Sequence, residues 1–413
     1  MTTRTLAHCQ TLDAADPLRP FKTQFHLPDG VIYLDGNSLG CMPKAAAARV
    51  KHVVEHEWAE GLIRSWNNAG WVGLSARLGG KIAPLIGAQT HEVRVTDSTS
   101  VNLFKLVSAS LKLRPGRHKI ITEPGNFPTD RYIIQGVCTF MDGPPELVTV
   151  PADQLADALD NQTALLLLTH VHYKSGRLHD MVELTARAQQ AGALVLWDLS
   201  HSVGALPVAL NECNADMAVG CGYKYLNGGP GAPAFVYVAE RHHPQLMQPI
   251  FGWFGHADPF AMSDDYTPAP GLDRAQTGTP SVLGASAMEV GLDLFHTVDM
   301  KALRQKSMTM TELFIELVEN QCIGHGFELV SPRQADQRGS QVSFSHPEGY
   351  AIMRALIDRG VIGDFRAPNI VRFGFAPLYL SYEDVWSAVQ CLTEIMDTRA
   401  WDAEVYQQRQ AVT

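Results

Sequence analysis

Seven short apolar runs between residues 92 and 238 constrain the fold of this 413-residue chain more than any other feature. Each run is almost continuously apolar, as strands buried on both faces of a sheet are, and helical patterns fill most of the gaps between the runs. This alternation predicts an α/β fold with a mostly parallel sheet that is covered by helices on both faces. The runs are 92–97, 119–124, 147–150, 164–170, 193–198, 216–221 and 233–238.

The pattern changes near residue 295. Residues 303–321 predict a long amphipathic helix, and the runs 341–346 and 369–377 alternate more, as antiparallel strands with one open face do. The second region therefore predicts a smaller α+β domain. We expect residues 1–58 to contribute to this small domain, residues 59–294 to form the large domain and residues 295–413 to form the C-terminal small domain.

Composition narrows the class of protein. The net charge of −10 and the isoelectric point near 5.9 give no electrostatic support for a nucleic-acid partner. The sequence has no run that approaches the ~20 apolar residues of a membrane span, and no apolar run near the N-terminus resembles a secretory signal. Its seven cysteines are scattered and form no CxxC pair, which is typical of reduced thiols. We expect a cytoplasmic protein without a nucleic-acid or membrane partner.

Polar residues stand where two of the central runs end. Asp198 closes the run 193–198, and Lys224 follows the run 216–221. A lysine can form a Schiff base with an aldehyde cofactor, and an aspartate can keep a pyridine nitrogen protonated, so the pair suggests pyridoxal phosphate. A structural salt bridge at Asp198 and a solvated loop lysine at position 224 are the alternatives.

Other run ends carry groups that suit such a cofactor. Ser98, Thr99 and Ser100 precede a helical pattern, where hydroxyls and free N–H groups form a phosphate site, although an ordinary N-cap uses the same residues. Phe127 and Asp130 stand in a proline-containing turn, where the aromatic ring either stacks on a planar cofactor or fills a gap in the loop.

Histidines and one serine offer competing interpretations. His170, His172 and His179 lack a carboxylate or cysteine at a familiar metal-ligand spacing, so we predict packed or hydrogen-bonded residues and no metal site. His201 stacks on a ring or caps the turn after Asp198. The segment GNSLG (36–40) fits the G-x-S-x-G elbow of serine hydrolases, yet Ser38 lies too near the N-terminus to follow several βα units.

Eight segments, in this order, resemble the kynureninase family over roughly residues 30–385. The Asp198 and Lys224 pair and the GTP segment alone would match many relatives in the class V aminotransferase superfamily. The segments are YLDGNSLG (33–40), DSTSVNL (97–103), GNFPTDRY (125–132), WDLSHSVGALPV (197–208), GCGYKYLNGGPGAPAFVYV (220–238), GWFGH (252–256), RAQTGTPSVLG (274–284) and VRFGFAPLYLSYEDV (371–385).

The resemblance implies fold type I of the pyridoxal phosphate-dependent transferases, the aspartate aminotransferase fold, in a homodimer with shared active sites. The implied reaction is hydrolytic Cβ–Cγ cleavage of L-kynurenine to anthranilate and L-alanine, which serves tryptophan catabolism or the synthesis of anthranilate or NAD precursors. Some members, notably those that favour 3-hydroxykynurenine, carry asparagine where this chain has Thr279. The threonine of this chain therefore favours kynurenine over 3-hydroxykynurenine as substrate. Another class V enzyme, a cysteine desulfurase or an aminotransferase, is the alternative, and Cys322 is the nearest candidate for a desulfurase nucleophile.

The resemblance also assigns roles to residues. Lys224 is the Schiff-base lysine, Asp198 holds the ring nitrogen and Tyr223 moves protons. Arg372 holds the substrate carboxylate, Asn37 and Ser38 form a substrate-side loop, and Trp66 and Trp71 either line the aryl pocket or pack in the core. Trp253 and Thr279 are implied to come from the other subunit. The implied cofactor contacts are Thr99, Ser100, Phe127, Asp130, Thr169, Asp198, His201, Tyr223, Lys224, Trp253 and Thr279.

Overall fold

The computed structural model describes residues 4–141 and 143–410, and its largest sheet has seven strands in the order β2-β8-β7-β6-β5-β3-β4. All seven apolar runs form these strands, and the sheet is mostly parallel, as predicted. Only β8 runs antiparallel to its neighbours β2 and β7. The strands are β2 (Val93–Val95), β3 (Lys119–Thr122), β4 (Glu146–Thr149), β5 (Thr163–Thr169), β6 (Leu194–Asp198), β7 (Met217–Cys221) and β8 (Ala234–Val238).

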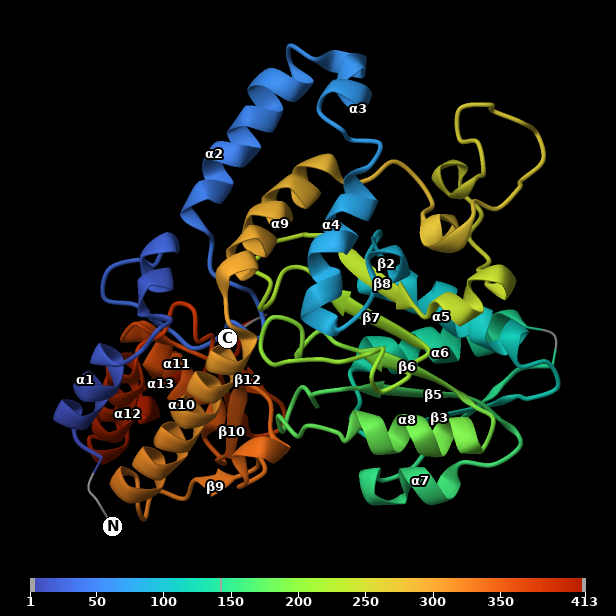
Figure 1. Cartoon of the computed structure of the whole chain (residues 1–413). Helices are drawn as coiled ribbons and strands as arrows, with labels where there is room; N and C mark the ends of the chain where they lie inside the picture. The colour runs from blue at the N-terminus through green and yellow to red at the C-terminus, as the bar shows by residue number, and fades with distance from the viewer. Residues whose placement is uncertain (1–3, 142, 411–413) are drawn as a thin grey trace.

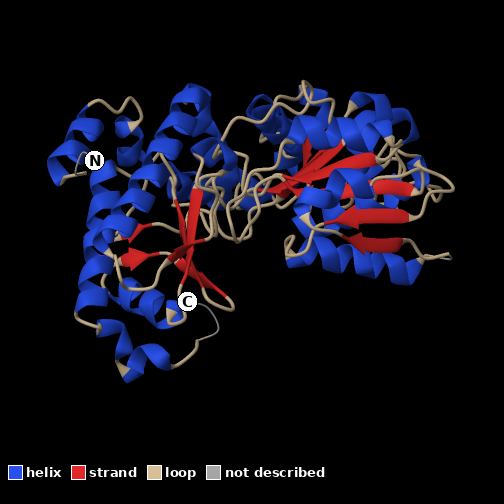
Figure 2. Cartoon of the chain, turned by 90° about the horizontal axis from the view of Figure 1, so that it is seen from below, coloured by secondary structure: helices blue, strands red, loops and turns tan. Residues whose placement is uncertain are grey.

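Both faces of this sheet are covered (Figure 2). Leu165 and Leu167 pack into one core with helix α5 (Thr99–Leu113) and helix α6 (Pro128–Phe140), whereas Leu166 and Leu168 pack into a second core with helix α8 (Met181–Gln190). Alternate side chains of one strand point to opposite faces, so each apolar run fills two cores at once. This is why the runs lack an alternating pattern.

The C-terminal region has its own antiparallel sheet, as predicted, with the strand order β12-β13-β10-β9. The long helix α10 (Met300–Gln321) packs on α12 and contributes Phe314, whose ring lies 4.7 Å from the ring of Phe373. The remaining elements are α9 (Val282–Leu294), β9 (Glu328–Leu329), β10 (Gln341–Ser345), α11 (Gly349–Asp358), β11 (Val361–Ile362), β12 (Asp364–Arg366), β13 (Ile370–Gly374), α12 (Tyr382–Asp397) and α13 (Glu404–Gln407).

The N-terminal segment lies against the C-terminal region (Figure 1). Helix α1 (Leu6–Ala14) packs on α12, and strand β1 (Ile32–Tyr33) pairs with β11. The carboxylate of Asp13 accepts the N–H groups of Tyr382 and Glu383 at the start of α12. These contacts place residues 6–33 against the C-terminal region, and the domain boundaries at residues 58 and 294 stay a prediction.

The chain then crosses to the large sheet through α2 (Lys44–His52), which continues as a π-helix over Val53–Trp58 and packs against α9. Two further helices, α3 (Ser65–Asn68) and α4 (Leu74–Ile82), lead to β2, and α7 (Leu155–Ala158) lies near β3. None of the described helices is long and apolar enough to cross a membrane.

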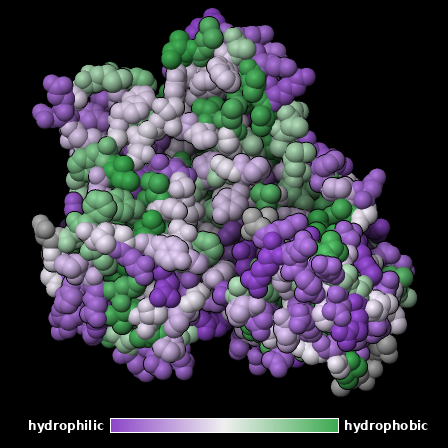
Figure 3. Space-filling model, turned by 180° about the vertical axis from the view of Figure 1, so that it is seen from behind, coloured by the Kyte–Doolittle hydropathy of each residue, from purple (hydrophilic) through white to green (hydrophobic). Residues whose placement is uncertain are grey.

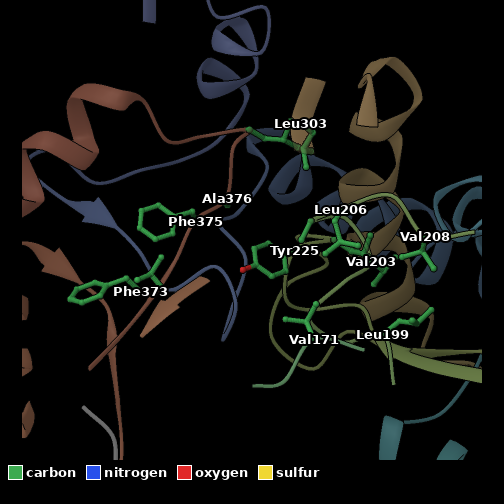
Figure 4. Packing of buried hydrophobic residues seen from close by; sticks show 14 of the residues in the cluster. Val171, Leu199, Val203, Leu206, Val208, Tyr225, Leu303, Phe373, Phe375 and Ala376 are labelled. Carbon is green, nitrogen blue, oxygen red and sulfur yellow. The ribbon is translucent and has the colours of Figure 1, made fainter. Parts of the chain in front are cut away.

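Apolar side chains join the two regions (Figure 4). Phe373 and Phe375 come from the C-terminal sheet, Leu199 and Val203 come from the loop after β6, and all four are buried in the same core. Tyr225 lies between them and donates a hydrogen bond from its hydroxyl to the carbonyl of Ser340 at 3.0 Å. The residues around Lys224 therefore sit where the two sheets meet.

Candidate active site

The parallel register brings the predicted residues to one edge of the sheet. Thr169 is paired with Asp198, and Asp198 with Val219, so the last residues of β5 and β6 lie beside β7. Lys224 follows the last residue of β7 by three positions. Ligands of open α/β sheets bind beyond the carboxyl ends of the strands, and Thr169, Asp198 and Lys224 all belong to this edge.

Lys224 is a buried cation with an unusual environment. Its side chain is only 8% exposed, and its Nζ lies 3.1 Å from Nε2 of His201. The Nζ atom also lies 5.5 Å from the ring centre of Phe127 and 5.8 Å from that of Tyr223. The alternative of a solvated loop lysine is therefore wrong.

Asp198 is buried as well, and it accepts the backbone N–H of Ser200 at 2.8 Å. Burial raises the pKa of Asp198, and the charge of Lys224 lowers it. No ion pair within 4.0 Å engages Asp198 in the described part of the chain, so the alternative of a structural salt bridge has no support. The site thus holds a buried carboxyl that lacks a close cation.

A second buried carboxyl lies beside it. Asp130 accepts hydrogen bonds from Nδ2 of Asn126 at 3.0 Å and from Oγ1 of Thr169 at 3.2 Å, and its Oδ1 has no partner. Burial, and then the nearby charge of Asp198, raises the pKa of Asp130 well above its ordinary value. The expectation of an irregular turn here is wrong, because Asp130 lies in the first turn of α6 and Phe127 is its N-cap residue. Pro128 occupies the first helical position, where proline is well tolerated.

The start of α5 has the predicted features of a phosphate site. Ser98 is the N-cap and accepts the N–H of Val101, and the half-buried Thr99 and Ser100 form the first helical positions. Ser98, Tyr223 and Thr279 line one cavity of about 660 Å³. Backbone N–H groups in the first turn and the positive end of the helix dipole favour an anion there.

A buried ion pair places Thr279 beside this helix. Lys105, which is 1% exposed, donates to Oδ2 of Asp97 at 2.5 Å and to the carbonyl of Ala275 at 2.6 Å. The hydroxyl of Thr277 donates to Oδ1 of Asp97 at 2.8 Å. One carboxylate thus joins the loop before α5 to the segment that carries Thr279.

A smaller cavity of about 140 Å³ is also lined by Tyr223 and brings together the predicted substrate residues. Arg372 is 2% exposed, and its Nε donates to Oδ1 of Asp364 at 2.7 Å. A second nitrogen of Arg372 donates to Asp364, and also to Oγ of Ser38 at 3.0 Å. The cavity is lined by Asn37, Ser38, Phe127, Tyr173, His201, Tyr223, Lys224, Arg366 and Arg372.

Asn37 packs tightly against strand β13. With its amide oxygen turned toward Arg372, it accepts from Nε at 3.0 Å. A Cβ atom on Gly374 would lie 1.6 Å from a terminal amide atom of the Asn37 side chain, so only glycine leaves room for this loop. Asn37 and Ser38 therefore surround Arg372 together.

The sequence did not single out Asp364, Arg366 or Tyr173. Arg366 donates to Oδ2 of Asp364 at 2.5 Å, and the carbonyl of Tyr173 accepts from Arg372 at 2.6 Å. The spacing Asp-x-Arg in β12 could have indicated that Asp364 and Arg366 bond to each other, because residues two apart on a strand share a face. Their register with Arg372 on β13 is not visible in the sequence.

Some predicted residues lie outside these two cavities. Trp253 packs edge-on against Phe254 at 4.7 Å, and Trp66 packs on Trp71 and on Phe254. Trp66 and Trp71 are half-buried and belong to neither of the two buried cores, so the core-packing interpretation is not confirmed and the aryl-pocket role stays a prediction. The prediction that Trp253 and Thr279 act in another subunit stays a prediction.

The competing nucleophiles lack catalytic partners. Oγ of Ser38 donates to Asp364 at 3.0 Å. A hydrolase serine needs a histidine partner, and none of the described histidines bonds to Ser38. Cys322 is 3% exposed at the end of α10, where its sulfur lies 3.5 Å from Oγ1 of Thr393 and lines neither cavity. His170 and His179 bond to Ser202 and Glu123.

Comparisons with known proteins agree with this architecture. A cysteine desulfurase from Thermococcus onnurineus superposes with a TM-score of 0.78 at 20% identity, over 92% of this chain and 98% of that one. A solved lysine-to-alanine mutant of C-DES, described with glycine covalently linked to its PLP cofactor, superposes with a TM-score of 0.79 at 18% identity, over 90% of this chain and 99% of that one. The fold is that of the pyridoxal phosphate-dependent enzymes of fold type I.

Sequence comparison gives the family. Residues 303–392 match the family model of the kynureninase C-terminal domain. A kynureninase from Burkholderia mallei is 54% identical over 99% of this chain and its own full length, and one from Pseudomonas fluorescens is 52% identical over the full length of both. The chain belongs to the kynureninase family.

The acidic residues around Arg372 make stability depend on pH. Burial, and then the charge of Asp364, raises the pKa of Asp35 from 3.8 to about 7. The folded protein therefore holds this proton more tightly than the unfolded chain, and Asp35 reduces the free energy of unfolding as pH rises through this window.

We expect Asp35→Asn to remove that loss. At pH 8 the variant should have a free energy of unfolding about 1–2 kcal/mol higher than that of the wild type. This is less than the free energy that corresponds to the whole pKa shift of Asp35, because nearby arginines stabilise its carboxylate. At pH 4 the difference should vanish. Denaturant titrations at both pH values measure this, with the exposed Asp29→Asn as control. A difference that stays constant with pH would contradict the role of Asp35.

Proposed function

We propose that the protein uses pyridoxal phosphate to cleave the Cβ–Cγ bond of L-kynurenine hydrolytically, giving anthranilate and L-alanine. Family membership and the meeting of Lys224, Asp198 and Arg372 in one buried region support this activity. The single observation that carries it is the buried Lys224 beside a buried carboxyl at the carboxyl edge of the sheet. Tryptophan catabolism is the proposed context, and the synthesis of NAD precursors would use the same reaction.

The residues present fit the cofactor. Asp198 is buried without a close cation, and a protonated ring nitrogen at its carboxylate would offset the cost of that burial. Oδ1 of Asp130 is a buried acceptor without a partner, and the α5 N-terminus offers Thr99 and Ser100 to a phosphate. When bound, pyridoxal phosphate supplies an aldehyde that bonds to an amino group and a ring that takes up electrons from bonds broken next to it.

The chain's own residues perform the remaining tasks. Nζ of Lys224 bonds the cofactor and moves the proton at the substrate α-carbon, and Phe127 and His201 flank it. Tyr223 keeps its phenolic proton, because the neighbouring Cys221 and burial raise the pKa of Tyr223. Tyr223 therefore acts as a proton donor in the half of the reaction that releases the products.

Arg372 binds the substrate carboxylate together with Asn37 and Ser38. Its guanidinium lines the cavity of Lys224, and Asp364 fixes its orientation. A guanidinium suits a carboxylate as a charged hydrogen-bond donor, and a substrate carboxylate would compete with Asp364, Ser38 and the carbonyl of Tyr173 for its N–H groups.

We also propose that two copies of the chain assemble and share their sites. Apolar side chains gather at the end of the molecule formed by α2 and α3 (Figure 3). Trp58, Leu62 and Ile63 are 58%, 58% and 76% exposed there, more than isolated surface residues usually are. A second copy that covers this surface would complete the 660 Å³ cavity beside Thr279. The seven free cysteines favour a reducing, cytoplasmic location.

Lys224→Ala tests the activity most directly. We expect anthranilate formation from L-kynurenine to fall by about 10³-fold or more, because the variant lacks the group that bonds the cofactor and moves the proton. Borohydride should attach the cofactor to Lys224 in the wild type and to no residue in the variant. Lys301→Ala, at an exposed position on α10, serves as control. Sulfide release from cysteine in place of anthranilate formation would instead favour a desulfurase.

Substrate choice gives a separate prediction. Wild-type protein should prefer L-kynurenine over 3-hydroxykynurenine in kcat/KM, because Thr279 is short and lacks an amide. Thr279→Asn should move this ratio toward 3-hydroxykynurenine by about tenfold, the value of one hydrogen bond. Steady-state assays with both substrates measure the ratio, and the exposed Thr297→Asn should leave it unchanged. An unchanged ratio in Thr279→Asn would remove Thr279 from substrate selection.

A further inference from the structure

A chain of hydrogen bonds leads from Lys224 into the C-terminal sheet. Nζ of Lys224 lies 3.1 Å from Nε2 of His201, and Nδ1 of His201 lies 3.1 Å from Oε1 of Gln341. Nε2 of Gln341 then donates to the carbonyl of Tyr173 at 2.8 Å. Gln341 is the first residue of β10, so this chain of hydrogen bonds links the lysine to the C-terminal sheet through His201.

The bonding partners fix where the His201 ring carries its proton. Carbonyl oxygens only accept hydrogen bonds, so the amide nitrogen of Gln341 must face the carbonyls of Tyr173 and His172. The amide oxygen therefore faces Nδ1 of His201, which must donate. At the other end, the ammonium of Lys224 only donates, so Nε2 must accept. Both ends require the same tautomer.

We propose that Gln341 is a positioning residue that holds His201 as the Nδ1–H tautomer, with the lone pair of Nε2 directed at Lys224. Gln341 does not line the cavity of Lys224, so it acts through His201. The tautomer follows from the hydrogen bonds alone, whereas its role in turnover rests on the proposed function of Lys224.

Burial keeps the imidazole neutral. His201 and Gln341 are 3% and 1% exposed. Burial first, and then the charges of Lys224 and Arg372, hold the pKa of His201 well below its ordinary value, although the bond to Gln341 opposes the shift. A neutral ring places no second positive charge beside Lys224, and the lone pair at Nε2 accepts a hydrogen bond that orients Nζ.

The fold makes room for a glutamine at this position. Gly176 has a φ of 71°, and a Cβ there would lie 2.9 Å from Cγ of Gln341. Methionine has a similar length but can neither accept from Nδ1 nor donate to Tyr173. Gln341→Met therefore removes both hydrogen bonds with little change in volume.

Nitrogen NMR of the full-length, cofactor-free protein with ¹⁵N-labelled histidine tests the tautomer. Comparison with His201→Asn identifies the signals of His201. At pH 7 we expect a protonated Nδ1 and an unprotonated Nε2 in the wild type, and averaged signals from exchanging tautomers in Gln341→Met. A protonated Nε2 in the wild type, or an unchanged tautomer in Gln341→Met, would overturn the proposal.

Kinetics of the cofactor-loaded enzyme supply the second measurement. Gln341→Met should lower kcat for L-kynurenine by about tenfold, with KM within about twofold, because the defect lies at Lys224 rather than at the substrate carboxylate. Gln248→Met is the matched control, since Gln248 is also buried and also donates to carbonyls, but lies outside the site. If Gln341 had a purely structural role, both variants would have a lower melting temperature and the His201 tautomer would be unchanged in Gln341→Met, which would contradict the proposal.

The two proposals fail separately. Normal turnover by Lys224→Ala would refute the proposed function while the NMR result still reports the tautomer. An essential Lys224 with a protonated Nε2 on His201 would refute only the role of Gln341.

Discussion

The structure depends on burying opposite charges at the carboxyl edge of a parallel sheet. Asp198 and Lys224 are both nearly inaccessible to water, yet no close ion pair joins them. Burial of this kind is costly unless another group stands between or beside the charges. The parallel register of β5, β6 and β7 imposes the arrangement, because it leaves Thr169 and Asp198 side by side next to the segment that carries Lys224.

The C-terminal sheet completes the site from the other side. Strand β12 supplies Asp364 and Arg366, β13 supplies Arg372, and β10 supplies Gln341. The carboxylate of Asp364 holds the guanidinium groups of both arginines. The carbonyl of Tyr173 accepts from both Arg372 and Gln341, so one backbone group contacts the arginine that is proposed to bind the substrate and the glutamine that bonds to His201. A shift of one sheet against the other would disturb both groups together.

Local patterns in the sequence predicted most of the large sheet. Its seven runs are the seven strands, since a strand buried on both faces is apolar at every position, as Leu165 to Leu168 are. The direction of β8 was not predictable, because an apolar run reads the same in either direction. The start of α6 was missed because Pro128 suggested a turn, although proline also begins helices.

The candidate site was predictable where a polar residue stands at the end of a strand, as Thr169 and Asp198 do, or shortly after it, as Lys224 does. The resemblance to a family added Arg372 and the loop of Asn37. Asp364, Arg366 and Gln341 were missed because their roles come from pairing between distant strands and from contacts across the two sheets. A single sequence carries no local signal for such contacts.

We propose that the carboxylate of Asp198 keeps the ring nitrogen of the bound cofactor protonated, and the chemistry at Lys224 depends on this proton. Nitrogen NMR of the loaded protein, with pyridoxal phosphate labelled at the ring nitrogen, measures this directly in the wild type and in Asp198→Asn. We expect a protonated nitrogen in the wild type near neutral pH and an unprotonated one in the variant. An unprotonated nitrogen in the wild type, or the same protonated signal in both proteins, would contradict it.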